Sequence, residues 1–158
     1  MYIKKGNYGT YIIILTLKKY LEIGIGKLGI INFKAGFYAY VGSAFSRGGL
    51  ESRLKHHLKI AQKPHWHIDY FRKYAKIEKI WFTNSQHRLE HEWAETLSLM
   101  PGITDQINGF GSSDCSCISH FFYFKKLPSI LIFKRTAQRN KNYDTFEIDL
   151  SKRKDLSM

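Results

Sequence analysis

The chain has 158 residues, of which 44% are hydrophobic and 15% aromatic, and it carries 25 lysines and arginines against 13 acidic residues, a net charge of +12. This length suits one domain with a real core, and the apolar content excludes a disordered chain. No run reaches the roughly 18 apolar residues that would span a membrane, and the N-terminus lacks the apolar region of a signal peptide, so we expect no membrane partner.

The first half of the chain predicts strands followed by one helix. Residues 10–17 form a continuous β-prone run, and from Leu50 the apolar residues recur at helical spacing until Pro64. Two further strands, residues 20–24 and 30–33, form a hairpin around a glycine turn, and another strand covers residues 36–42.

The second half predicts further helices and strands in alternation. We expect helices over residues 67–76 and 86–100, strands over residues 77–83, 120–124 and 130–134, and a glycine- and serine-rich loop over residues 109–117. The fold class is therefore α/β: a single domain with a small, largely antiparallel central sheet flanked by helices. We expect the domain to cover residues 1–136, followed by a basic polar tail, 137–158, with one short strand at 145–150.

The positive charge is concentrated at the two ends of the chain. Residues 1–60 hold a balance of +8, residues 61–124 of −1 and residues 125–158 of +5. A basic surface with many aromatic rings favours nucleic acid as the partner, because lysine and arginine displace counterions and rings stack on bases. The alternative is that the lysines only keep the surface soluble.

Two helices carry polar residues beside their apolar stripes. In the first helix Arg53 and His57 lie four residues apart on one flank of a stripe centred near Leu54. In the third helix Glu90 and Glu92 flank the stripe on opposite sides. A glutamate at the edge of a core can hold a hard divalent cation, so we take Glu92 as a candidate ligand of Mg²⁺ or Mn²⁺.

Those residues suit the hydrolysis of a phosphodiester. Such a reaction needs an activated water, stabilised charge on the phosphate and help for the leaving oxygen. Arg53 can clamp phosphate oxygens, and the metal on Glu92 can stabilise the leaving group. We expect nearby positive charge to favour the phenolate form of Tyr11 or Tyr40, on strands that we expect to be neighbours.

Several phrases resemble the GIY-YIG nuclease family in its own order. They are Gly9-Thr10-Tyr11, Tyr40-Val41-Gly42-Ser43-Ala44, the helix with Arg53 and His57, and Leu89-Glu90-His91-Glu92-Trp93-Ala94. The resemblance implies that Tyr11 and Tyr40 are the active-site tyrosines, Arg53 the catalytic arginine, His57 its basic companion and Glu92 the metal ligand. Between the tyrosine phrases lie 28 residues, which include an extra hairpin.

Residues 8–124 also resemble a little-characterised microbial branch of that family. The shared phrases are His65-Trp66-His67-Ile68-Asp69-Tyr70, Gly109-Phe110-Gly111-Ser112-Ser113-Asp114-Cys115 and Ser119-His120. With Gly42 and Ser43, they make His67, Asp69 and Asp114 supporting residues of the site. The resemblance implies a metal-dependent endonuclease, which we expect to cut DNA of particular structure or to act in DNA repair, with RNA left open. From the cysteines we expect it in the cytoplasm. The alternative is a nucleic-acid-binding module without catalysis.

The cysteines and histidines of these phrases have two interpretations. Cys115 and Cys117 are too close for an ordinary disulfide, which favours a reducing compartment. Together with His120 and the first histidine phrase they could share a structural zinc ion, although their spacing is not a standard zinc motif. Alternatively, His67 and Asp69 hydrogen-bond to each other or to the glycine loop.

Overall fold

The computed structural model describes residues 3–4, 6–137 and 143–152 and forms one α/β domain around a six-stranded sheet. The sheet has the order β6-β7-β4-β1-β5-β8, and every neighbouring pair in it is antiparallel. Its strands are β1 (Gly9–Leu17), β4 (Gly36–Ala44), β5 (Lys76–Thr83), β6 (Ile103–Gln106), β7 (Phe121–Phe124) and β8 (Phe146–Asp149). The helices are α1 (Gly49–Leu58), α2 (His67–Arg72), α3 (Glu90–Leu99) and α4 (Ile130–Thr136). The predicted fold class is confirmed.

Strand β1 lies in the middle of the sheet because both of its faces are apolar. It pairs with β4 on one side and with β5 on the other. Tyr11, Ile13 and Leu15 belong to one hydrophobic core, whereas Ile12 and Ile14 belong to the other. A strand covered on both faces is expected to read as a continuous apolar run, as this one does.

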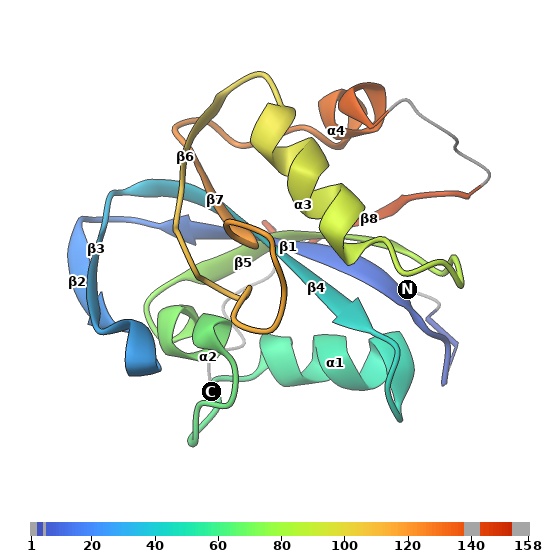
Figure 1. The fold of residues 1–158 in the computed structure, drawn as a ribbon, viewed down its shortest axis with the longest axis horizontal. Helices are drawn as coiled ribbons and strands as arrows, with labels where there is room; N and C mark the ends of the chain where they lie inside the picture. The colour runs from blue at the N-terminus through green and yellow to red at the C-terminus, as the bar shows by residue number, and fades with distance from the viewer. Residues whose placement is uncertain (1–2, 5, 138–142, 153–158) are drawn as a thin grey trace.

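The helices cover the two faces of the sheet in pairs. Helices α1 and α2 lie on the face of Tyr11, and α3 and α4 lie on the opposite face (Figure 1). The opposite core is built around Trp81 of β5 and Trp93 of α3, both fully buried. The residues at the ends of β1 and β4 therefore lie between two helical layers.

The extra hairpin folds as a small sheet of its own. It consists of β2 (Leu21–Gly24) and β3 (Ile30–Phe33), joined through a short 3-10 helix at Gly26–Leu28. It packs beside α2, and Phe33 contributes to the core on that side (Figure 1). Strands β1 and β4 pair along their whole length despite the insertion.

One predicted strand is wrong, since residues 130–134 belong to helix α4. The hydroxyl of Ser129 caps that helix by accepting a hydrogen bond from the backbone N–H of Leu131. Its fully buried residue is Phe133, which contacts Trp81 and Trp93. With a single buried side chain in seven residues, the segment lacks the alternation of buried and exposed residues that a strand of the sheet would show.

Other boundaries also differ from the prediction. Helix α1 ends at Leu58, well before Pro64, and α2 ends at Arg72 rather than residue 76. Helix α3 begins at Glu90, four residues later than expected, and β6 was not predicted. Arg72 donates hydrogen bonds to carbonyls at the end of α1, and at the start of α3 the N–H of Leu89 donates one to Thr10. The local sequence does not display these contacts.

The sheet continues past the expected domain boundary at residue 136. Strand β8 pairs with β5 from Lys79 to Phe82, and Leu150 after it is buried in the core. The predicted short strand is present there, and it completes the edge of the sheet. In the part of the chain that the structure describes, no helix is long and apolar enough to cross a membrane.

Candidate active site

The register between β1 and β4 brings the two candidate tyrosines together. Tyr11 lies opposite Gly42, and Tyr40 lies opposite Ile13, so all four residues share one face of the sheet. Both tyrosines are buried, Tyr11 completely. The inserted hairpin therefore leaves their mutual placement intact.

Gly42 is required by the position of the Tyr11 ring. A Cβ atom at residue 42 would overlap the phenol carbon and oxygen of Tyr11. Only glycine lets the phenol cross β4 at this point, which gives a packing reason for the glycine of the Tyr40-Val41-Gly42 phrase.

His57 of α1 faces the hydroxyl of Tyr11. Its Nε2 atom lies 2.7 Å from the Tyr11 oxygen in a buried hydrogen bond. Burial lowers the pKa of His57 to about 3, and the neighbouring His56 adds to the effect. The imidazole is therefore neutral at physiological pH, and one of its tautomers accepts the phenol proton.

Without a metal ion, the side chains around the two tyrosines do not favour a phenolate. Burial raises the pKa of Tyr11 well above its usual value, and burial likewise raises the pKa of Tyr40. The positive charge of Arg53 acts in the opposite direction on both but is outweighed. Both phenols are therefore protonated at neutral pH.

Arg53 is held at the entrance to the site. Its guanidinium donates a hydrogen bond to the hydroxyl of Ser46, 3.1 Å away, and stacks 4.4 Å from the centre of the Trp66 ring. A guanidinium braced by an aromatic face keeps its donors in a fixed plane, which suits bidentate contacts to an oxyanion.

These residues border a polar pocket with a volume of about 350 Å³. Five of the predicted supporting or catalytic side chains line it, together with the glycine of the β4 phrase and other residues just before α2, in α3 and in the loop before β7. The lining comprises Tyr40, Gly42, Ser43, Arg53, His65, Trp66, His67, Glu90, Gly111, Ser113 and Asp114. Tyr11 and His57 lie buried behind this lining and are connected to it through Tyr40.

The acidic residue of α3 that lines the pocket is Glu90, and Glu92 does not line it. Glu90 raises the pKa of both Tyr11 and Tyr40 through its negative charge, after burial the largest such effect on Tyr40. Glu92 is exposed, and its charge acts on Tyr143. The two acids flank the helix stripe symmetrically in sequence, and the packing of Trp93 decides which one faces the tyrosines.

The other supporting residues hold the walls of the pocket. His67 accepts a hydrogen bond at Nδ1 from the backbone N–H of Gly111, 2.9 Å away, which confirms the predicted contact with the glycine loop. Gly111 has φ +72°, and a side chain there would press against Tyr40 and His120. The loop is thereby fixed directly over Tyr40.

Asp69 has a structural role beneath Trp66. One carboxylate oxygen accepts hydrogen bonds from the backbone N–H groups of His65 and Trp66, and the other accepts one from His56 Nε2 at 2.9 Å. These bonds hold the pKa of Asp69 below its usual value although burial acts to raise it. The carboxylate therefore orders the start of α2 and the ring on which Arg53 stacks.

The chain is thus an α/β domain with one candidate site. At this site a tyrosine pair, an arginine and an acid lie around a polar pocket. Residues 10–142 match the model of the family described as domain of unknown function DUF123, and the chain belongs to that family. No curated protein and no solved structure matches this chain.

Proposed function

We propose that this protein is a divalent-metal-dependent endonuclease that hydrolyses phosphodiester bonds in DNA. The observation that supports this most is the buried Tyr11–His57 hydrogen bond placed behind a pocket lined by Tyr40, Arg53 and Glu90. The resemblance of the two tyrosine phrases to the GIY-YIG nucleases points to the same activity.

In this proposal each residue has a role that its position allows. Arg53 binds the non-bridging oxygens of the scissile phosphate, for which its planar donors are suited. Tyr40, which lines the pocket, would hold the attacking water by a hydrogen bond, and its phenolate, favoured when a cation is bound, would take the proton of that water. The hydrogen bond between Tyr11 and His57 fixes the Tyr11 ring behind it. Residues of the glycine-rich loop form another wall of the pocket and so limit where the substrate can lie.

The acids of the pocket fit Mg²⁺ or Mn²⁺. Glu90 is partly buried and Asp114 is exposed, and both contribute negative charge near Tyr40. Carboxylate oxygens with water in the remaining positions are the usual ligands of these cations. A bound cation would supply positive charge that stabilises the phosphate and favours ionisation of a nearby phenol. Glu90 thus takes the place that the sequence pattern gave to Glu92.

The substrate follows from charge. The net charge of +12 favours a polyanion, because lysine and arginine displace the counterions of phosphates. We propose DNA of branched, flapped or damaged structure, with a role in repair, and RNA remains a substrate to compare. The two free cysteines suit a reducing compartment such as the cytoplasm.

The decisive experiment separates the two neighbouring glutamates. Labelled duplex, flap and junction DNA and a matching RNA are incubated with the protein in Mg²⁺ or Mn²⁺. We expect cleavage by the wild type, a loss of about 10²-fold or more in Arg53→Ala and Glu90→Ala, and nearly full activity in the matched control Glu92→Ala. Cleavage that persists in the first two variants would contradict this assignment.

A binding module without catalysis is favoured by one observation. Both phenols and His57 are neutral and buried, so the site holds no ready base in the absence of a cation. Under this alternative the wild type binds DNA but never cuts it, and Glu90→Ala binds as well or better, because a negative charge near phosphate is lost. Robust cleavage by the wild type eliminates the alternative.

A further inference from the structure

Four metal-binding side chains from two distant segments meet beside the pocket. They are His91 in the first turn of α3, Cys115 and Cys117 in the loop before β7, and His120 at the end of that loop. One ligand atom from each lies within 4.8 Å of those of the other three. The chain has two cysteines in all, and both are in this cluster.

The distances suit a single tetrahedral ion. His91 Nδ1 lies 3.0 Å from the Cys117 sulfur, and His120 Nε2 lies 3.5 Å from the Cys115 sulfur. Ligands at the usual zinc–sulfur and zinc–nitrogen distances are separated from one another by roughly 3.3–3.8 Å in a tetrahedron. The four atoms therefore need only small movements to enclose one ion.

The partner of His120 gives an independent indication. His120 is 1% exposed, and its Nδ1 atom has no hydrogen bond, although Glu90 Oε1 lies 3.0 Å away. When Nε2 of an imidazole binds a metal, Nδ1 carries the proton and usually donates it to a carboxylate. Zinc on Nε2 would thus hold the proton on Nδ1, from which it can be donated to Glu90 after a small adjustment.

The charges also balance. Two thiolates and two neutral imidazoles around Zn²⁺ have no net charge. Burying such a site halfway therefore costs little solvation free energy. The second group of neighbouring ligand atoms, His56, His57 and Asp69, is different, because hydrogen bonds to Tyr11, His65 and Trp66 already occupy it.

We propose that His91, Cys115, Cys117 and His120 bind one structural zinc ion, which ties the glycine-rich loop to the start of α3. With all four positions filled by protein, the site leaves none open for substrate. Through His120 the ion would fix Glu90, and through the loop it would fix Gly111 against Tyr40. The proposal does not depend on nuclease activity.

The test measures metal rather than catalysis. Protein without an affinity tag is purified under reducing conditions, and zinc is determined by elemental analysis. We expect one zinc per wild-type chain and less than a tenth of that in Cys115→Ser/Cys117→Ser and in His91→Ala. His87→Ala, which removes an exposed histidine just before α3, should keep the full amount.

Spectroscopy of the wild type covers the case in which the variants fail to fold. Cobalt(II) added to the zinc-free protein should give the strong visible bands of a tetrahedral ion together with thiolate-to-cobalt charge transfer. X-ray absorption of the zinc form should show two sulfur and two nitrogen neighbours. Wild-type protein with no bound zinc, or a metal shell without sulfur, would overturn the proposal.

Discussion

At the scale of single residues, burial decides the protonation of the site. His57 is surrounded by the positive groups Arg53 and Arg72, by His56 and by the carboxylate of Asp69, yet loss of water is the largest influence on its pKa. A neutral imidazole can share the Tyr11 proton, whereas an imidazolium cannot accept it. Loss of water also outweighs the positive charge of Arg53 at Tyr11 and Tyr40, although that charge was the reason to expect a phenolate from the sequence.

The depressed pKa of His57 predicts a pH dependence of stability. An unfolded histidine binds a proton below about pH 6.5, whereas folded His57, with a pKa of about 3, does not until much lower pH. The unfolded state therefore binds more protons as pH falls, and the free energy of unfolding should decrease by up to about 1.4 kcal/mol per pH unit.

Urea unfolding between about pH 7 and 5 checks this prediction, because Asp69, whose pKa is lowered in the folded state, affects stability only once the pH approaches the ordinary aspartate pKa of about 4. The pKa of His67 is also lowered by burial and adds to the slope. His57→Gln should therefore show a shallower slope than wild type, and exposed His87→Gln the same slope. Equal slopes in all three proteins would contradict the assignment.

At the scale of elements, one buried arginine joins the ends of α1 and α2. Arg72 donates hydrogen bonds to the backbone carbonyls of His57 and Leu58 at the end of α1, and of Ala75 before β5. The last carbonyls of a helix have no partner within it, so a cation here both satisfies them and complements the helix dipole. This explains why α1 can end at Leu58 without a glycine cap.

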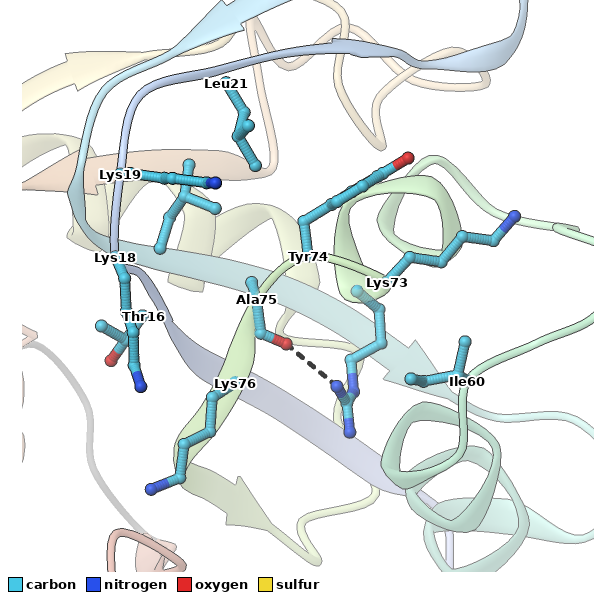
Figure 2. Close-up of a pocket in the computed structure, with 11 residues that line it drawn as sticks. Thr16, Lys18, Lys19, Leu21, Ile60, Lys73, Tyr74, Ala75 and Lys76 are labelled. Atoms are coloured by element: carbon cyan, nitrogen blue, oxygen red, sulfur yellow. Dashed lines mark hydrogen bonds between the residues drawn. The ribbon is translucent and has the colours of Figure 1, made fainter. Parts of the chain in front are cut away.

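The same arginine borders a second pocket, lined by lysines and by Thr16, Leu21, Ile60 and Tyr74, at the far end of β1 (Figure 2). The side chains of Lys18, Lys19, Lys73 and Lys76 extend around it. The Arg72 guanidinium is occupied by backbone carbonyls there, including that of Ala75 at 2.9 Å. We therefore assign it a structural rather than a ligand-binding role.

Arg72→Ala is predicted to destabilise the fold by about 2–3 kcal/mol, because buried carbonyls lose charged donors. Denaturant unfolding measures the change, and Lys73→Ala, at the exposed neighbouring position, should lie within about 0.5 kcal/mol of wild type. If the two variants were equally stable, the clamp on α1 would have no energetic role.

At the scale of the whole molecule, the positive charge and the position of the pocket at Arg53 predict how the proposed binding of nucleic acid would depend on salt. Arg53 stands at the pocket, whereas Arg135 is exposed on α4, over the opposite face of the sheet. Only an arginine that contacts phosphate releases a counterion on binding.

Binding of a flap or junction DNA without divalent cation should therefore weaken steeply with salt. In Arg53→Ala the slope of log affinity against log salt should fall by about one unit, whereas Arg135→Ala should leave it unchanged. Fluorescence anisotropy over a salt series gives both slopes. A smaller slope in Arg135→Ala than in Arg53→Ala would place the nucleic acid on the other face.

The sequence by itself determined the elements whose signals are local. The continuous apolar run of β1 and the four-residue spacing of Arg53 and His57 both act over a few residues, so their pattern predicts them. The fold class followed from those elements, because the two sides of a buried sheet must be covered by helices.

Only the tertiary structure decided which residues meet. Glu90 and Glu92 are equivalent in sequence, and the rotation of α3 set by Trp93 brings Glu90 to the tyrosines. His91 joins Cys115 and Cys117 across 24 residues or more, a contact that no local pattern displays. Burial, which governs the pKa of His57, is likewise a property of the packed molecule, since it depends on what other segments remove from water.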